Sequence, residues 1–433
     1  MAGTLAERGL RVLAVDRNLV GGECPYWGCV PSKMMIRAAD ALGEARRVEG
    51  LAGSVGEVRP DWTVVAKRIR EEATDDWNDH VAVERLEGKG ATVLHGTGRI
   101  TGPGRVDVDG TAYAATKGVV VNPGTTPAVP PIEGLRDTPY WTNHEIIEAA
   151  ELPASLVVLG GGAIGCELSQ VMARFGVEVT IVEAAERILS PEEPEASEKV
   201  TAALEADGIT VRAGVGADKV GHDGSMFTIT LADGSTLEAE RLLVATGRRT
   251  DPAAVGLDAV GVPSDARTAP VDDRCRVTDS VWAVGDITGK GAFTHVSMYQ
   301  AGIVIRDVLG EDGPPAEYAA LPRVTFTDPE VGAVGMTEKQ AREKLANVTV
   351  GLVPLGETTR GWIAKADGFI KVVADADRGV LVGATSMGPA GGEVLGALAV
   401  AVHGQVPVDR MRSMIYAYPT LHRGIETALG DLS

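Results

Sequence analysis

A glycine-rich turn in the middle of the chain constrains the fold more than any other feature of the sequence. The stretch LVVLGGGAIGCELSQ (156–170) places Gly160, Gly162 and Gly165 between an apolar strand and a helical pattern, and Glu183 closes the next strand. Such glycines let the backbone approach a pyrophosphate, the helix start offers it free N–H groups, and the acid accepts hydrogen bonds from a ribose. The order strand, turn, helix and acid predicts a dinucleotide-binding domain.

The residues after the second strand indicate which nicotinamide cofactor is used. Glu183 would repel a 2′-phosphate, and the three residues that follow it offer no cation. Arg187 is the nearest candidate cation, and its alternative interpretation is a salt bridge within the loop. The sequence therefore favours NADH over NADPH.

The rest of the chain alternates predicted strands and helices, with glycines at many turns. Residues 10–16 form an apolar strand that ends in an acid, residues 33–48 have a helical period, and residues 61–90 continue as an amphipathic helix. Strands and helices also alternate from residue 322 to the end. This pattern predicts an α/β fold, and 433 residues suggest about three domains.

Composition excludes several classes of partner. A formal net charge of −19 argues against nucleic acid and anionic membranes, which require basic patches. No apolar run approaches the roughly 18–20 residues that cross a bilayer, and the first residues lack a secretory signal. Four cysteines in such a chain fit a reducing cytoplasm, where a close pair is usually catalytic or metal-binding. We expect no metal site, because no second cysteine or histidine pair lies nearby at zinc spacing.

Two of those cysteines stand close together in the stretch GGECPYWGCVPSK (21–33), which precedes the helical pattern. A thiol near the start of a helix gains stabilisation of its thiolate from the helix dipole. The alternative is that Cys24 and Cys29 are two small buried apolar residues. The flanking glycines and the Pro-Ser-Lys that follows favour a redox-active pair.

The same stretch resembles the redox-active motif of the flavin-dependent pyridine nucleotide–disulfide oxidoreductases, which include dihydrolipoyl dehydrogenase, glutathione reductase and mercuric reductase. Other motifs similar to those of the family follow in the expected order over nearly the whole chain, and the dihydrolipoyl-dehydrogenase-like members are the most similar. These motifs are the glycine turn at 160–165, LLVATGRRTD (242–251), VWAVGDITG (281–289), TFTDPEVGAVGMT (325–337) and GFIKVVAD…GVLVGATSMGP (368–389).

The resemblance implies a role for individual residues. Cys24 matches the interchange thiol that attacks the substrate, and Cys29 matches the thiolate that exchanges electrons with the flavin. Lys33 and Glu167 match an ion pair beside the flavin, for which an exposed surface pair is the alternative. It also implies FAD and NAD(H) as cofactors, NADP(H) being less favoured. The cofactor-binding residues would be Asp16, Gly21, Gly22, Lys33, Gly124, Gly160, Gly162, Ala163, Ile164, Gly165, Glu183, Gly247, Arg248, Gly285 and Asp286.

The sequence departs from the family pattern at the beginning of the chain. Members of the family begin with a strand and a glycine turn that binds the FAD pyrophosphate, whereas AGTLAERGLRVLAVD (2–16) corresponds only to the second half of that unit. Either the chain binds FAD poorly or its N-terminus is incomplete. We expect an incomplete N-terminus, because the other FAD motifs are present.

A second departure lies near the other end, in the segment YAYPTLHRG. Disulfide-acting members have a histidine and a glutamate that form a general acid–base dyad, and here Tyr418 and Arg423 occupy those places. Tyrosine is a poor base at neutral pH, although it can donate a proton. On a helical frame His422 would turn to a similar face, but a surface histidine is the favoured interpretation. The catalytic set is thus Cys24, Cys29, Lys33, Glu167 and Tyr418.

We expect three domains, and several functions stay open. The FAD-binding domain would comprise residues 1–150 and 273–318, the NAD-binding domain residues 151–272, and a C-terminal homodimerisation domain residues 319–433. The leading hypothesis is electron transfer from NAD(P)H through FAD and the cysteine pair to a disulfide or other small acceptor. The alternatives are reduction of mercuric ion or a quinone, and a catalytically weak paralogue kept as a structural or regulatory dimer. In the homodimer Tyr418 would face the other subunit's Cys24.

Overall fold

The computed structural model describes residues 1–433. The chain forms two compact units, each assembled from segments that are distant in the sequence. The first unit comprises Met1–Ser32, Ala66–Ala128 and Gly247–Glu317, and the second comprises Lys33–Val65, Val129–Thr246 and Tyr318–Ser433.

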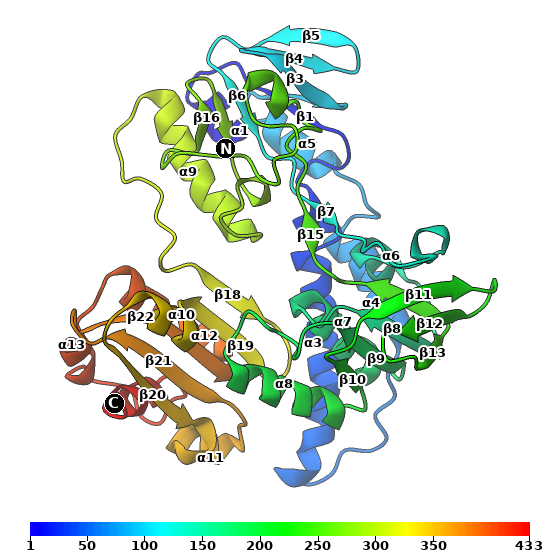
Figure 1. The fold of residues 1–433 in the computed structure, drawn as a ribbon, viewed down its shortest axis with the longest axis vertical. Helices are drawn as coiled ribbons and strands as arrows, with labels where there is room; N and C mark the ends of the chain where they lie inside the picture. The colour runs from blue at the N-terminus through cyan, green and yellow to red at the C-terminus, as the bar shows by residue number, and fades with distance from the viewer. The chain divides into compact units, whose positions relative to one another are not determined.

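Small sheets, short helices and one longer helix, α9, make up the first unit (Figure 1). Strand β1 pairs in parallel with β2, β6 pairs in parallel with β17, and β3, β4 and β5 form an antiparallel sheet. The strands are β1 (Leu13–Asp16), β2 (Thr92–His95), β3 (Gly98–Gly102), β4 (Arg105–Val108), β5 (Thr111–Ala114), β6 (Val119–Val121), β7 (Thr126–Pro127), β15 (Arg248–Arg249), β16 (Arg276–Thr278) and β17 (Val281–Ala283). The helices are α1 (Ala2–Glu7), α2 (Glu23–Tyr26), α5 (His80–Glu87) and α9 (Thr294–Leu309), with the short turns η4 (Leu257–Val260) and η5 (Asp286–Thr288).

The single amphipathic helix predicted over residues 61–90 is wrong, because the chain breaks in its middle. Helix α4 (Trp62–Arg68) passes into one π-helical turn, η2 (Ile69–Ala73), and α5 begins only at His80. Between them Asp75, Asp76 and Trp77 all have positive φ angles, which a right-handed helix does not allow. The apolar period of the sequence does not register this reversal.

The second unit contains a parallel sheet in the order β10-β9-β8-β14, as the glycine turn predicts. Strand β8 has four fully buried residues in its five, so it lies in the middle of the sheet, covered on both faces. The elements of this part are η3 (Leu135–Asp137), α6 (Asn143–Glu148), β8 (Ser155–Leu159), α7 (Ala163–Arg174), β9 (Glu178–Glu183), α8 (Pro194–Ala206), β10 (Thr210–Ala213), β11 (Ala217–His222), β12 (Phe227–Leu231), β13 (Thr236–Ala239) and β14 (Arg241–Val244). The long helix α3 (Cys29–Arg47) and η1 (Val48–Gly50) precede them in the chain.

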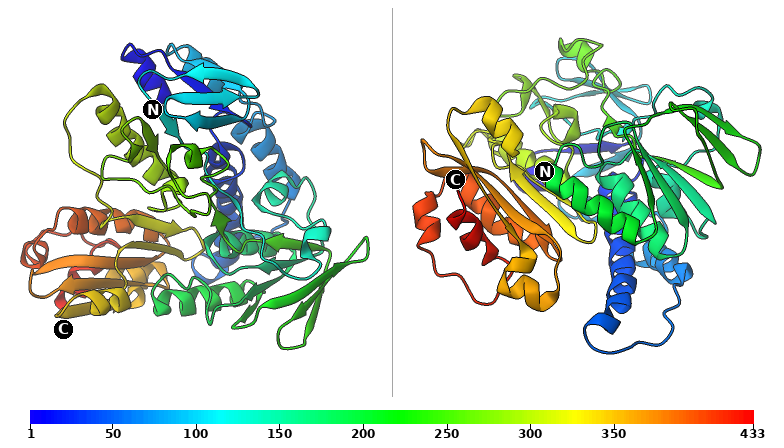
Figure 2. Two further views of the ribbon diagram at one scale, coloured as in Figure 1. Left: turned by 45° about the horizontal axis from the view of Figure 1, so that its top comes forward. Right: turned by 60° about the horizontal axis from the view of Figure 1, so that its bottom comes forward.

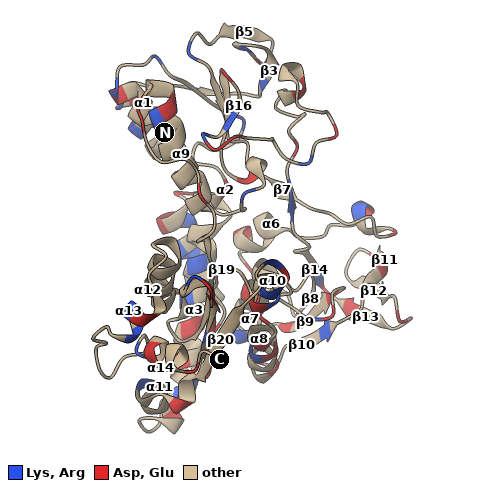
Figure 3. Ribbon diagram, turned by 60° about the vertical axis from the view of Figure 1, so that its left-hand side comes forward, with Lys and Arg blue, Asp and Glu red and all other residues tan.

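The C-terminal part of the second unit is a five-stranded antiparallel sheet in the order β18-β19-β22-β21-β20 (Figures 1 and 2). Alternate residues of β21, namely Ile370, Val372 and Ala374, share one hydrophobic core with residues of α12 and α14. The intervening Lys371 therefore faces the other side of the sheet, where it meets acidic residues from the start of α8 and from α10, helices whose charges Figure 3 colours. The elements are β18 (Pro322–Thr325), β19 (Glu330–Gly335), α10 (Glu338–Lys344), β20 (Val348–Pro354), η6 (Leu355–Glu357), α11 (Thr359–Ala364), β21 (Phe369–Asp375), β22 (Val380–Gly388), α12 (Gly391–His403), α13 (Val408–Arg412) and α14 (Gly424–Gly430).

None of these helices combines the length and the apolar character that crossing a membrane requires.

Candidate active site

The two cysteines of the sequence motif lie together in the first unit. Cys24 belongs to the short helix α2, Cys29 is the first residue of α3, and the Cys24 side chain is hydrogen-bonded to Cys29. Both are thiols in this structure. The hydrogen bond to Cys29, and after it burial, raises the pKa of the Cys24 thiol.

A threonine that the sequence analysis did not single out completes this cluster. The Oγ1 atom of Thr294 lies 3.4 Å from Sγ of Cys29, and the same hydroxyl is hydrogen-bonded to Cys24. Thr294 is the first residue of the 16-residue helix α9, so the thiols lie at a helix N-terminus. Thr294 comes 265 residues after Cys29, and no spacing rule in the sequence connects them.

The predicted flavin ribose ligand ends the first strand of this unit. Asp16 is the last residue of β1, and its carboxylate accepts a hydrogen bond of 2.9 Å from the backbone N–H of Asn18. Burial raises the pKa of Asp16. Gly21 and Gly22 follow in the turn before α2 with φ angles of +117° and +74°, a region that L side chains rarely adopt.

The other predicted flavin residues of this unit converge on Thr125. The Thr125 hydroxyl donates to Oδ2 of Asp286 at 3.0 Å and accepts from Nε of Arg248 at 2.6 Å. Arg248 also forms a salt bridge of 2.9 Å to Glu23, so its guanidinium is held by protein groups. Beside Asp286, the N–H of Gly285 donates to the Gln300 side chain at 2.6 Å.

Two further glycines of the predicted set leave open space beside the backbone. Gly124 and Gly247 have φ angles of +70° and +115°, and a Cβ at either position would meet no atom within 4 Å. Open backbone next to the Asp286 carboxylate, together with the Asp16 carboxylate at a strand end, provides hydrogen-bond acceptors that fit the ribityl and ribose hydroxyls of FAD.

The predicted ion pair lies within the second unit. Nζ of Lys33 is 2.7 Å from Oε2 of Glu167, whose side chain is only 6% exposed. The other carboxylate oxygen accepts a hydrogen bond of 2.8 Å from the backbone N–H of Phe326, and Lys33 Nζ lies 4.7 Å from the centre of the Phe326 ring. The alternative of an exposed surface pair is therefore wrong.

The glycine turn between β8 and α7 has the geometry that a dinucleotide requires. Gly160 has a φ of +109°, and a Cβ at Gly165 would lie 2.0 Å from the Gly160 carbonyl oxygen, so neither tolerates a side chain. A Cβ at Gly162 would meet no atom within 4 Å, which leaves the backbone open for a ligand. Ala163 and Ile164 are exposed at the start of α7.

The acid that closes β9 is held beside that turn. Oε2 of Glu183 accepts the N–H of Gly161 at 2.6 Å, and Oε1 accepts the N–H of Ala185 at 2.7 Å. Each carboxylate oxygen keeps a second lone pair for a ribose hydroxyl. Arg187 makes no salt bridge: its guanidinium donates to the backbone carbonyls of the loop that follows it, at Leu189, Ser190 and Glu192.

Near the C-terminus, Tyr418 is well exposed and His422 does not accompany it. The side chain of Tyr418 is 65% exposed, and its hydroxyl donates to Thr359 Oγ1 at 3.3 Å. The Arg423 guanidinium lies 5.4 Å from the centre of the Tyr418 ring. His422 does not share a helical face with Tyr418, because no helix runs between α13 and α14, and His422 lies instead beside Tyr416.

Comparisons with known proteins agree with this fold. A family model described as pyridine nucleotide-disulphide oxidoreductase matches residues 1–301, and the model of that family's dimerisation domain matches residues 321–429. The mercuric reductase of Shigella flexneri is 34% identical and aligns with 98% of this chain and 76% of its own length. The dihydrolipoyl dehydrogenase of Chlorobaculum tepidum is 32% identical over 98% of this chain and 92% of its own.

Solved structures give the same result. LpdA of Mycobacterium tuberculosis superimposes with a TM-score of 0.87 at 25% identity, covering 99% of this chain and 95% of that one. The Cu(II) complex of RclA, a HOCl-induced flavoprotein disulfide reductase of Escherichia coli, has a TM-score of 0.85 at 26% identity, with 100% and 96% coverage.

The fold and the matches define a class: flavin-dependent enzymes that exchange electrons with a pyridine nucleotide. This chain belongs to the pyridine nucleotide-disulphide oxidoreductase family. Its members use FAD and a pyridine nucleotide, and the α/β fold predicted from the sequence is confirmed. The C-terminal match to the dimerisation domain agrees with a homodimer.

Proposed function

We propose that this chain is an NADH-dependent flavoprotein that reduces a disulfide or another small acceptor through Cys24 and Cys29. The observation that carries the proposal is the thiol cluster, in which Cys24 is hydrogen-bonded to Cys29 and Thr294 contacts both sulfurs at the start of α9. Two structural cysteines would not require this arrangement, since free cysteine is usually packed as a small apolar residue.

The cysteine pair would act by thiol–disulfide exchange. Bound FAD would carry two electrons from the nicotinamide to the Cys24–Cys29 disulfide. In the reduced pair, Cys24 would first lose its proton, and its thiolate would then attack one sulfur of the acceptor disulfide, so that a mixed disulfide forms and the acceptor S–S bond breaks to expel a thiolate, which takes up that proton. The Cys29 thiolate then attacks Sγ of Cys24, expels the second thiolate and restores the intramolecular disulfide. The two protons of the reduced pair leave with the two product thiols, so atoms and electrons balance.

Lys33 and Glu167 would serve the flavin as an ion pair. The buried Glu167 carboxylate fixes the Lys33 ammonium, and the Phe326 ring adds a cation–π contact. An ammonium held in this way would present a fixed positive charge to the flavin, on which electron density increases during reduction.

The loop after β9 supports NADH over NADPH. Glu183 places a negative charge where the adenosine ribose would bind, and Arg187 already donates three hydrogen bonds to backbone carbonyls. Recruiting Arg187 to a 2′-phosphate would leave those carbonyls without their donor. We expect kcat/KM for NADH to exceed that for NADPH by more than about tenfold, which is roughly 1.4 kcal/mol.

A second candidate acceptor is a metal ion. Tyr418 occupies the place where disulfide-acting relatives have a histidine base, and two relatives that are 34% and 33% identical are named mercuric reductases. In the proposed homodimer Tyr418 of one subunit would face Cys24 of the other and would donate a proton or hydrogen bond rather than accept one. The proposed boundaries are residues 1–150 and 273–318 for FAD, 151–272 for NAD and 319–433 for dimerisation.

Anaerobic titration with NADH tests the redox pair. The wild-type flavoprotein is expected to develop a long-wavelength thiolate-to-flavin absorbance band, which Cys29→Ser should abolish. Cys275→Ala, which removes a buried thiol elsewhere in the first unit, is the matched control and should keep the band. A protein that purifies without flavin absorbance would support the alternative of a catalytically weak paralogue. Unchanged turnover of Cys24→Ala with every acceptor would show that the exchange mechanism is wrong.

A panel of acceptors then identifies the substrate class. Lipoamide, glutathione disulfide, mercuric ion and a quinone would each be offered with NADH, with wild type compared to Tyr418→Phe. Loss of turnover with one acceptor on removing the hydroxyl would assign Tyr418 to that reaction. Quinone turnover that survives Cys24→Ala would instead indicate direct electron transfer from the flavin.

A further inference from the structure

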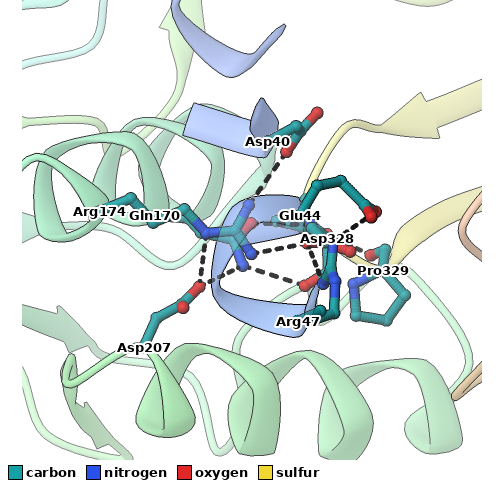
Figure 4. A network of polar contacts seen from close by, with 9 residues as sticks. Asp40, Glu44, Arg47, Gln170, Arg174, Asp207, Asp328 and Pro329 are labelled. Atoms are coloured by element: carbon teal, nitrogen blue, oxygen red, sulfur yellow. Dashed lines mark hydrogen bonds and ion pairs between the residues drawn. The ribbon is translucent and has the colours of Figure 1, made fainter. Parts of the chain in front are cut away.

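A buried arginine organises a polar cluster in the second unit (Figure 4). The side chain of Arg174, the last residue of α7, is 3% exposed and forms ion pairs with three aspartates. The distances are 3.0 Å to Asp40 on α3, 2.9 Å to Asp207 after α8, and 2.7 Å to Asp328 between β18 and β19. One guanidinium thus joins four separate segments of the chain.

The cluster requires an arginine at position 174 and a residue without a side chain at position 43. A Cβ added to Gly43 of α3 would lie 2.9 Å from an Arg174 nitrogen, so the glycine leaves the space that the guanidinium fills. The planar guanidinium donates in three directions at fixed angles, which a lysine ammonium does not reproduce. Asp328 is also bound by Arg47 at 2.7 Å.

The cluster is connected to the predicted flavin ion pair through the strand-end segment 325–329. The Gln170 side chain accepts the N–H of Asp328 at 2.7 Å and donates to its carbonyl at 3.0 Å. Two residues earlier, the N–H of Phe326 donates to Glu167. Gln170 and Glu167 lie on α7 with Arg174, so one face of that helix binds the segment at three successive points.

Ion pairs therefore join helices α3 and α7 at both ends of this polar face. Lys33 and Asp40 are seven residues apart on α3, and Glu167 and Arg174 are seven apart on α7, which is two turns in each helix. Lys33–Glu167 closes one end and Asp40–Arg174 the other. A shift of either helix or of Asp328 would be transmitted to the Glu167 carboxylate, because its bonds to Lys33 and Phe326 are the ones that hold it.

We propose that Arg174 is a positioning residue for the flavin ion pair: by holding Asp40 and Asp328 it fixes α3 and the 326–328 backbone, and so fixes Glu167 and Lys33. This inference rests on the proposed role of Lys33 and Glu167 beside the flavin. Arg174 itself touches neither member of the pair. Its effect passes through the Asp328 segment and through the two helices.

A second buried cation provides a matched control. Lys371 is also 3% exposed and also pairs with three carboxylates, those of Glu193, Glu195 and Glu338. None of these carboxylates bonds Glu167, Lys33 or the 326–328 backbone. Loss of Lys371 should therefore destabilise the same unit without moving the flavin ion pair.

The test compares Arg174→Gln with Lys371→Gln in the full-length flavoprotein. We expect both variants to melt at a lower temperature than wild type. Only Arg174→Gln should lower the flavin midpoint potential, because the Lys33 charge is no longer fixed, and slow single-turnover flavin reduction by NADH by about ten- to hundredfold. Lys371→Gln should change that rate by less than about twofold.

A milder pair of variants keeps the test decisive if Arg174→Gln does not fold. Asp328→Asn keeps the Gln170 contacts to the backbone but weakens the guanidinium contact, and it should shift the flavin potential in the same direction by less. Glu195→Gln weakens a Lys371 contact that has no link to the 326–328 backbone, and it should leave the potential unchanged. The inference is wrong if the arginine and lysine variants shift the potential equally, or if Asp328→Asn shifts it no more than Glu195→Gln. Failure of the wild type itself to be reduced by NADH would instead overturn the proposed function.

Discussion

Arg174 and Lys371 are two buried cations in one unit with nearly the same surroundings. Each is 3% exposed, each pairs with three carboxylates, and each joins the dinucleotide-binding part to the C-terminal sheet. They differ in the further hydrogen bonds that their carboxylate partners and the adjacent backbone make. The backbone next to Asp328 is hydrogen-bonded to Glu167 through the N–H of Phe326. The glutamates around Lys371 are instead exposed to solvent or hydrogen-bonded to the start of α10.

The difference shows that a count of ion pairs does not reveal what a cluster does. Exposure does not separate the two clusters either, because each combines buried and partly exposed carboxylates. The partners of Lys371 are 4%, 38% and 30% exposed, and those of Arg174 are 37%, 17% and 18% exposed. We expect Lys371 to contribute to stability alone and Arg174 to contribute to stability and to the site.

Among variants that compare the Arg174 and Lys371 clusters, we expect Lys371→Met to lower the free energy of unfolding most. Glu193, whose side chain is 4% exposed, would keep its charge without a cation, and removing one member of a buried pair costs about 3–5 kcal/mol of unfolding free energy. Chemical denaturation at pH 7 measures this cost. Lys199→Met, which breaks a pair with the 65% exposed Asp367, should cost at most about 1 kcal/mol. Equal costs in the two variants would show that the Lys371 cluster is not effectively buried.

A smaller effect is expected from Gly43→Ala, which attacks the Arg174 cluster by sterics alone. The new methyl group would lie 2.9 Å from the guanidinium and displace it, and overpacking of this kind costs about 1–3 kcal/mol. Gly302→Ala in α9 is the control, because the nearest atom to its methyl is 4.0 Å away at the flexible end of Arg306. That control should be neutral or slightly stabilising, since alanine favours a helix. A Gly43→Ala protein as stable as wild type would show that the guanidinium has room to move.

The smallest effects are opposite pH dependences in the two clusters. Burial raises the pKa of Asp40 to about 6 from an ordinary 3.8, so its contribution to stability is present below pH 3.8 and is lost as the pH rises to about 6. The hydrogen bond from Lys371 lowers the pKa of Glu338, so its contribution is present above the ordinary 4.5 and is lost as the pH falls.

Thermal denaturation of Asp40→Asn and Glu338→Gln between pH 4 and 7 checks these signs. The advantage of wild type over Asp40→Asn should shrink as the pH rises, while its advantage over Glu338→Gln should grow from the acid end. Both differences should stay within about 1 kcal/mol, because each carboxyl is about a third exposed. Slopes of the same sign would mean that the two carboxyls do not experience opposite environments.

The sequence was sufficient for features whose cause is local. The turn from Gly160 to Gly165 was predictable because close backbone approach requires glycine, and the α/β alternation follows from apolar periodicity. The break after α4 was not, because three consecutive residues with positive φ carry no glycine to mark them. Local patterns thus predicted the elements but not each of their ends.

Contacts between segments that are far apart in the chain could not be predicted from local sequence patterns. Thr294 reaches the thiols only because α9 begins there, and Arg174 looks in the sequence like an ordinary basic residue at the end of a helix. The three aspartates that pair with Arg174 lie 134, 33 and 154 residues away from it in the sequence. Lys33 and Glu167 were recognisable only because both belong to motifs that resemble those of a known family.

The connections of Arg174 and Lys371 also determine how this protein can be recombined. Both clusters cross from the part that precedes residue 246 to the part that follows residue 318. A chimera that takes its C-terminal sheet from a relative would separate Arg174 from Asp328 and Lys371 from its glutamates unless the donor supplies the same side chains. In domain shuffling, residues 33–65, 129–246 and 318–433 should therefore be inherited together.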